Sequence, residues 1–465
     1  MDSLAQNFEN EKALSKRISS FFRRFHIGAI LRKSNAYKER GISVTSLFAY
    51  LFQLVFRNRS MYLDMQTGKA FDFHKDTIYR MKNSIHINWI RFTTLLAAAV
   101  IETAIKPLTS EDRRDVFIVD DSIYERNRSK KVELLARVFD HAHHRYIRGF
   151  RMLTLGWSDG VSFLPINSCL LSTENQKNRL NESKTVKKQT FGAEIREMAQ
   201  SKATDVTLQL IQKAQAAGIR AKYVLFDSWF ATPKMMLNLK AMNLDTVAMI
   251  KKTNKIKFLY NGQKLSNKEI FGINRKRRGR SKYLLSVTVE ICGDTNIQAK
   301  LVFVRNRKNK SDYLVLISTD TSLQENEIIQ LYGKRWDIEV FFKACKSFLR
   351  LTDECRSISY DAMCCQTALV FTRYIFLALA IREDRDGRSL GPLFCLICDE
   401  IADISFDDAL EKLHLFLEEL AQKLNAAQVD FHAFIADFLT QLPADLARMV
   451  NHVLPQVAKC QSSSR

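Results

Sequence analysis

The chain contains 465 residues, and its hydrophobic fraction of 46% is that of a globular protein, which excludes wholesale disorder and predicts about two to four domains. A formal net charge of +21 is typical of proteins that bind a polyanion, with a basic surface that has no partner as the alternative. No run of about eighteen apolar residues occurs, so we expect no membrane contact.

The first residues of the chain and the spacing of its cysteines indicate the cellular compartment of the protein. The first residues, MDSLAQNFENEKALSKR, lack the charged and then apolar layout of a secretion signal. The nine cysteines have no regular spacing, and an odd number of them fits a reducing cytosol. We therefore expect a cytoplasmic protein.

Residues 1–110 are predicted to be helical. In SVTSLFAYLFQLVF (43–56), apolar residues recur every three or four positions after a capping residue, Ser43 or Thr45. Basic residues are scattered through the region, which fits a small DNA-binding region, with a purely structural helical region as the alternative.

Residues 111–244 alternate between strand and helix patterns. The chain order is a strand, a hairpin, a helix, a strand and a helix: 115–121, 149–171, 204–218, 223–227 and 231–243. The hairpin turn is expected at Ser158-Asp159-Gly160, and both single strands end in aspartate. This order predicts an α/β core.

Residues 245–320 read as strands, which predicts a β-rich insertion. Its most basic run is NRKRRGRSK (274–282), where we expect Arg277 and Arg278 to bind phosphate rather than to lie in a merely solvated turn. Residues 321–358 and 359–465 are predicted to be helical. Leucines spaced by three and four in the second of these segments suit a helix–helix contact, within the chain or between two copies.

The segment DHAHHR (140–145) places three histidines among arginines. A metal site would need partner ligands at regular spacing, which this sequence does not offer. The nearby arginines favour a basic segment that faces DNA instead; they are Arg137, Arg145, Arg148 and Arg151.

The stretch YGKRWDIEVFFKACK (332–346) has the spacing of one helix. At about 100° per residue, five of its polar side chains fall within an arc of roughly 80°. They are Tyr332, Arg335, Glu339, Lys343 and Lys346. One interpretation of such an arc is a solvent-exposed helix face with ion pairs and no catalytic or binding role. The alternative is a helix face that looks into a cleft.

Two strand-ending aspartates favour the cleft. Asp120 follows VFIV, Asp227 follows YVLF, and ligands collect at strand ends in open α/β sheets. With Glu339 they would supply three oxygen ligands, which suit Mg²⁺ or Mn²⁺, and two such ions about 3.5–4 Å apart catalyse phosphodiester cleavage. The cations beside Glu339 would then hold phosphates.

The spacing Tyr-x2-Arg-x3-Glu-x6-Lys, formed by Tyr332, Arg335, Glu339 and Lys346, resembles the signature of DDE transposases of the IS-four family of bacterial insertion sequences. VDDS (119–122) and FDSWF (226–230) are similar to the aspartate motifs of that family. The added Trp336 and Lys343 are similar to the transposon-five enzyme's version of the signature. The resemblance covers roughly residues 110–355.

The resemblance implies a ribonuclease H-like catalytic core, interrupted by the β-rich insertion and flanked by helical N- and C-terminal regions. It implies a bacterial, nucleoid-associated enzyme that works as a homodimer on paired ends of double-stranded DNA. With Mg²⁺ or Mn²⁺ bound, such an enzyme nicks the terminal inverted repeats and joins the freed 3′-hydroxyl to target DNA. Asp120, Asp227 and Glu339 would bind metal, and Tyr332, Arg335 and Lys346 would contact terminal phosphates.

Three alternatives stay open on the sequence. Asp121 stands beside Asp120 and on a strand would point to the opposite side. Trp336 and Trp229 would stack on an unpaired base, but Trp229 also suits a core position beneath the site. The rival functions are a metal-dependent DNA endonuclease without strand transfer and a non-catalytic DNA-binding protein derived from a transposase.

Overall fold

A computed structural model of the chain describes residues 16–56, 61–62, 73–109, 113–140, 143–173, 175–277, 281–293, 295–306 and 312–383. The chain divides into two compact units, residues 1–383 and 384–465, and every described residue belongs to the first. The helix–helix contact and dimerisation expected near the C-terminus therefore fall mostly outside the described residues.

The strands of the described chain form one mixed sheet. They are β1 (Val116–Glu125), β2 (Ala136–Asp140), β3 (Arg145–Ser158), β4 (Phe163–Leu171), β5 (Tyr223–Phe226), β6 (Asp245–Ile250), β7 (Lys257–Tyr260), β8 (Gln263–Ser266), β9 (Tyr283–Ile291), β10 (Ile297–Arg305) and β11 (Tyr313–Ser318). The order is β2-β3-β1-β5-β6-β11-β10-β9-β7-β8, with β4 paired to β3. β5 runs parallel to β1 and β6, and the other described pairs are antiparallel.

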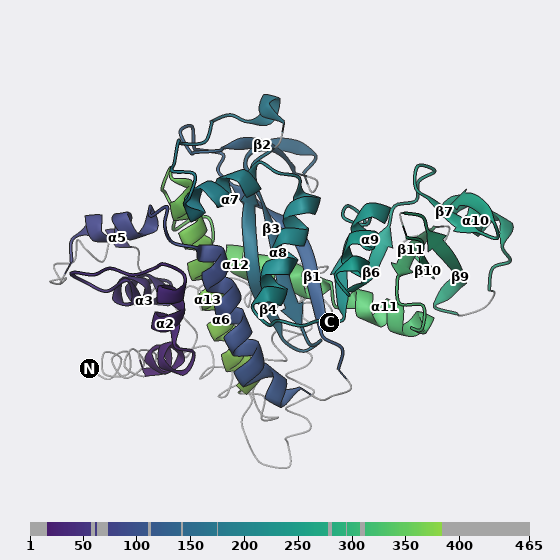
Figure 1. Ribbon diagram of the computed structural model, residues 1–465, viewed down its shortest axis with the longest axis horizontal. Coiled ribbons are helices and arrows are strands. Elements are labelled where there is room, and N and C mark those ends of the chain that lie inside the picture. The colour runs from purple at the N-terminus through teal and green to yellow at the C-terminus, as the bar shows by residue number, and fades with distance from the viewer. Residues whose placement is uncertain are drawn as a thin grey trace, which may run out of the picture. The chain divides into compact units, whose positions relative to one another are not determined.

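The described helices pack on this sheet or on one another. They are α2 (Ile27–Lys33), α3 (Val44–Leu54), α5 (Lys75–Lys82), α6 (Trp89–Val100), α7 (Phe191–Ala199), α8 (Ala203–Ala216), α9 (Pro233–Ala241), α10 (Asn267–Ile273), α11 (Glu325–Gly333), α12 (Trp336–Ser347) and α13 (Tyr360–Glu383). Figure 1 shows α6 and α13 alongside the sheet, where both contact β4 and each other. α2 and α3 pack onto α6 and α13, which joins the N-terminal helices to the core.

The α/β pattern predicted from the sequence is confirmed, with local corrections. The hairpin of β3 and β4 turns at Asp159, Ser43 rather than Thr45 caps α3, and the described elements of residues 16–109 are helical. The helix expected at 204–218 is α8, which begins at Ala203 with Lys202 at the N-cap position and no side-chain cap.

The strands after β6 were predicted, but the short helix α10 among them was not. β11 pairs with β6, so the strands of the expected insertion continue the same sheet instead of forming a separate one. The boundaries of the expected domains stay a prediction.

α13 is long and apolar enough, by length and composition, to cross a membrane. However, 72% of its apolar window, Tyr360–Ala380, is buried in the protein. The helix also carries a buried arginine, Arg373, whose guanidinium donates to the Glu354 carboxylate at 2.6 Å and to backbone carbonyls of α3. These contacts are those of a core helix.

Candidate active site

The pairing of β1 with β5 brings two aspartates together. Ile118 lies opposite Leu225 in this parallel pair, and side chains alternate along a strand. Two residues further along, Asp120 and Asp227 therefore stand at equivalent positions on one side of the sheet. The charge of Asp227 acts on the Asp120 carboxyl, which agrees with this placement.

Asp120 was expected at the end of its strand and lies instead in its middle. β1 continues to Glu125 because β3 pairs with it along its whole length, whereas β5 pairs only with Val116–Ile118. Asp120 thus begins the part of β1 that β5 no longer flanks. That edge is open to the helix that carries Glu339.

Asp120 and Asp121 point to opposite sides, as alternation requires. The Asp120 carboxylate accepts from the Arg335 guanidinium at 3.0 Å. The Asp121 carboxylate is bonded to the Arg151 guanidinium, and Arg151 lies over the ring of Trp229 at 4.2 Å from its centroid. Of the two aspartates, only Asp120 faces the glutamate helix.

The stretch 332–346 is not one uninterrupted helix, so the single-face argument holds only in part. α11 ends at Gly333, Lys334 and Arg335 form a tight turn with i to i−3 hydrogen bonds, and α12 begins at Trp336. Tyr332 therefore belongs to α11, while Glu339 and Lys346 belong to α12. Glycine at 333 lowers helix propensity, and tertiary contacts of Lys334 fix the turn.

Arg335 joins the acids. Its guanidinium donates to Asp120 and, one helical turn away, to the Glu339 carboxylate. Only 14% of its side chain is exposed, and its Nε is buried with no hydrogen-bond partner among the described residues. Carboxylates from β1 and α12 therefore share one guanidinium, and Asp227, at the end of β5, stands at the position next to Asp120.

Burial controls ionisation in this group. It raises the pKa of the Asp120 carboxyl to about 7, since the loss of hydration outweighs the attraction of Arg335. Burial also raises the pKa of the Tyr332 hydroxyl above its ordinary value, while Arg335 opposes the rise. A cation at this site favours the carboxylate form of Asp120.

The cations of the predicted motif differ in their contacts. Lys346 Nζ donates to Ser122 Oγ at 2.7 Å, and Ser122 shares the Asp120 side of β1. Burial lowers the pKa of this amine. Lys343 is exposed on α12. Arg277 lies over the Tyr283 ring at 4.4 Å, outside the carboxylate group, and Arg278 lies outside the described residues.

Two tryptophans lie beside the acids with exposed rings. Trp336, the first residue of α12, is 52% exposed. Trp229 is 38% exposed, so the expectation of a core position for it is wrong. Its backbone N–H donates to the Asp227 carboxylate at 2.9 Å, which ties the tryptophan to the second aspartate.

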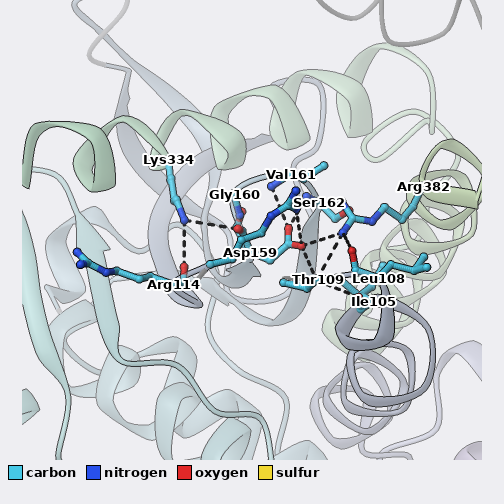
Figure 2. A network of polar contacts seen from close by, with 12 residues as sticks. Ile105, Leu108, Thr109, Arg114, Asp159, Gly160, Val161, Ser162, Lys334 and Arg382 are labelled. Atoms are coloured by element: carbon cyan, nitrogen blue, oxygen red, sulfur yellow. Dashed lines mark hydrogen bonds and ion pairs between the residues drawn. The ribbon is translucent and has the colours of Figure 1, made fainter. Parts of the chain in front are cut away.

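Sequence reasoning missed a buried network that positions the glutamate helix. Figure 2 shows the Asp159 carboxylate accepting from Thr109 Oγ1 at 2.7 Å, from Arg382 at 3.1 Å and from the N–H groups of Val161 and Ser162. Lys334 Nζ donates to the backbone carbonyl of Asp159 in this turn and to that of Arg114 before β1, and Ser158 donates to Asp337 on α12.

Because Gly160 has no side chain, Lys334 can approach the β3–β4 turn closely. The φ of Gly160 is +90°, and a side chain there would meet the Lys334 amine at 2.8 Å. Asp159 lies in a turn signal and its partner Arg382 lies 223 residues later in the chain, so no local pattern in the sequence indicated the network.

The donor chemistry of the carboxylates fits a hard divalent cation, because all three ligands are oxygens. In the present geometry Arg335 lies between Asp120 and Glu339, and no group of three or more histidines, cysteines and acids among the described residues is arranged to hold a metal. The guanidinium thus supplies the positive charge next to Asp120 and Glu339 that a bound metal ion would otherwise supply.

Two protein-family models match the sequence. One, described as DDE superfamily endonuclease, matches residues 58–280, and the other, described as transposase DDE domain, matches residues 188–376. Asp120 and Asp227 fall within the first match, and Asp227 and Glu339 within the second. The chain is therefore similar to DDE-type endonucleases and transposases across the segments that supply all three acids.

One solved structure is similar at low identity. It is described as the cryo-EM structure of a piggyBac transposase synaptic complex with hairpin DNA, and it shares 13% sequence identity over 80% of this chain and 76% of that chain, with a TM-score of 0.45. No curated protein matches the sequence.

Proposed function

We propose that this protein is a DDE transposase of the IS-four type, which excises its element by metal-dependent hydrolysis and 3′-hydroxyl attack and joins it to target DNA. The observation that carries the proposal is the convergence of Asp120, Asp227 and Glu339 on one side of the sheet. The order of strands around them fits a ribonuclease H-like core. The expected setting is the bacterial cytoplasm and nucleoid, with two copies on paired ends.

The acids would hold one or two Mg²⁺ or Mn²⁺ ions, which when bound activate water and stabilise the leaving oxygen. The protein's own part is to fix three oxygens from separate elements and to keep the Asp120 carboxyl charged when a cation is near. Because Asp120 lies beyond the β5 pairing, its carboxylate faces the helix that carries Glu339 and not a neighbouring strand on that edge.

Basic groups around the acids suit a phosphate chain. The buried Nε of Arg335 has an unused donor, and Lys346 and Tyr332 lie on the same side as Asp120. A guanidinium can bind two phosphate oxygens at once, whereas the lysine adds a point charge. These residues orient the phosphate next to the acids.

The exposed rings of Trp336 and Trp229 suit an unpaired base at the end of the element. Base–aromatic stacking tolerates any sequence and is worth about 1–3 kcal/mol per base. Because Trp229 is attached through its N–H to Asp227, a base stacked on it stays close to the cleaved phosphate.

The test uses the full chain, Mg²⁺ or Mn²⁺, and DNA that carries the short inverted repeats expected to flank the gene. We expect nicks at the repeat ends, followed by joining of pre-cut ends to a target plasmid. Chelation with EDTA and Glu339→Gln should each abolish both steps, while Glu339→Gln keeps DNA binding. Cleavage without joined product would establish the endonuclease alternative, and binding without cleavage the non-catalytic one.

A further inference from the structure

Two arginines face each other at one end of the sheet. β2 and β3 pair antiparallel, with Arg137 opposite Arg148 and Phe139 opposite Tyr146. Both arginines are exposed, and neither forms an ion pair with any described residue. Like charges directly opposite on neighbouring strands repel each other. This arrangement destabilises the isolated protein and suits an anionic partner.

The surroundings of the pair suit the same partner. Tyr146 is 65% exposed, with its ring edge-on to Phe139 at 5.1 Å between centroids. Asn127 and Asn178 complete the lining of a surface pocket with the two arginines and the tyrosine. The pocket therefore offers guanidinium, hydroxyl and amide donors. We refer to Arg137, Tyr146 and Arg148 as the β2–β3 arginine patch.

The acids nearest the patch in the chain have other hydrogen-bond partners. The Glu125 carboxylate is bonded to the Asn127 amide, and the Asp140 carboxylate is bonded to His143 Nδ1 at 2.7 Å. Asn127 also accepts from the Arg148 backbone N–H at 2.9 Å, which fixes the strand end. Among the described residues, neither Arg137 nor Arg148 forms an ion pair with these acids, and both guanidinium groups lie on paired strands.

The patch lies on the same side of the sheet as the candidate active site. Asp120 is opposite Thr154 on β3, and alternation puts Arg148 and Tyr146 on the Thr154 side. Between them Phe150 is buried under Tyr360, at 6.0 Å between ring centroids. A ligand that reaches both places must pass over this covered part, so it must be long.

The separation can be expressed in base pairs of a DNA duplex that runs along β3. Thr154 and Arg148 are six positions apart on this strand, which is about 20 Å at roughly 3.3 Å per residue. A duplex rises about 3.4 Å per base pair, so the patch lies about six base pairs from the phosphate near Asp120.

We propose that the β2–β3 arginine patch binds the phosphate backbone of duplex DNA about six base pairs from the cleaved phosphate. The inference rests on the proposed function, which supplies DNA as the partner, and adds a second contact region remote from the acids. Arg151, expected from the sequence to share this basic segment, does not, because it points to the other side and binds Asp121.

The test compares two single substitutions, Arg148→Gln and Arg145→Gln. Each removes one charge from an exposed position of β3, but alternation puts Arg145 on the opposite side. Affinity for a 30-base-pair duplex is measured from about 50 to 300 mM salt. Each phosphate contact contributes about 0.9 to the slope of log K against log salt, so Arg148→Gln should lower that slope by about 0.9 and Arg145→Gln should leave it unchanged.

Thermal unfolding of the free protein shows whether Arg148→Gln changes the stability of the fold as well as DNA binding. Arg148→Gln removes a repulsion, so its thermal midpoint should equal or exceed that of the wild type. Equal slopes for both variants and the wild type would overturn the patch while leaving the proposed function intact, provided the wild type binds and nicks DNA. If the wild type binds no duplex, the proposed function fails together with the patch.

Discussion

Asp120 and Asp121 are neighbours in the chain but have opposite surroundings. Asp120 faces Arg335 and the glutamate helix, whereas Asp121 holds Arg151 against the exposed ring of Trp229. The acid that a metal would bind and the acid that positions an aromatic side chain are therefore adjacent. Alternation along one strand is enough to separate the two roles.

This separation predicts different effects of the two amide substitutions. Asp120→Asn should lower metal-dependent nicking by about 10³-fold or more, because a metal site contributes several kcal/mol to the transition state. Asp121→Asn should keep nicking within about tenfold, since the contact that it loosens, Arg151 over Trp229, lies on the side of β1 away from Glu339. Single-turnover nicking of an element-end duplex in Mn²⁺ measures both.

A second measurement tests whether Asp121→Asn acts through the stacking of a base on Trp229. Binding to a duplex with an unpaired terminal base should weaken in Asp121→Asn, and binding to a fully paired duplex should not. Loss of nicking in Asp121→Asn with retention in Asp120→Asn would reverse the assignment of the metal-binding acid.

At the scale of elements, the position of α12 depends on the turn between β3 and β4. The Asp159 carboxylate accepts hydrogen bonds from Thr109, Arg382 and two backbone N–H groups (Figure 2). The backbone carbonyls of Asp159 and Arg114 accept from Lys334, the residue before Arg335. Residues from four separate segments are thereby fixed next to the start of the glutamate helix.

Asp159→Asn should therefore destabilise the protein, and the effect should depend on pH. Burial alone would raise the pKa of Asp159, but hydrogen bonds from Ser162, Thr109 and Val161 and the charge of Arg382 hold it below its ordinary value of 3.8. A lowered pKa means that the folded state favours the charged form. The stabilisation is then full above pH 3.8 and is lost as pH falls through the lower folded-state value.

We expect Asp159→Asn to lower the free energy of unfolding by roughly 3 kcal/mol at pH 7, because it leaves the buried Arg382 without its carboxylate. Urea unfolding across pH 2–7 should show this deficit shrinking below pH 3.8. Glu182→Gln is the control, since its partner is Arg179 and the Glu182 side chain is 72% exposed, so it should change little. A deficit that stays constant down to pH 2 would contradict the role of the charge.

The elements show which parts of the site a sequence can predict. Strand patterns and the spacing of Arg335, Glu339 and Lys346 depend on local periodicity, and they indicated residues that the structure brings together, since Arg335 bonds to both Asp120 and Glu339. The break after Gly333 was missed, because Lys334 is held by carbonyls of Arg114 and Asp159 that are far away in the chain. The bridging role of Arg335 and the pairing of Asp121 with Arg151 also arise only from tertiary contacts.

At the scale of the whole molecule, charge is distributed beyond the acids. The net charge of +21 indicated a polyanion from composition alone, but composition could not distinguish the arginines that bind acids within the protein from those left for a partner. Arg196, for example, is buried between Glu133 and Asp361, while Arg137 and Arg148 are exposed without an ion pair among the described residues.

This surplus of charge predicts how the protein's stability responds to DNA. Self-repulsion of a basic protein opposes folding, and a bound duplex both relieves it and stabilises the folded state by mass action. At about 100 times Kd the gain is about 2.7 kcal/mol, which should raise the thermal midpoint by several degrees at 50 mM salt. The rise should shrink toward zero by about 0.5 M salt, because counterion release weakens binding. Differential scanning fluorimetry with a 30-base-pair duplex measures it, and a rise that persists unchanged at high salt would show that contacts other than phosphate dominate binding.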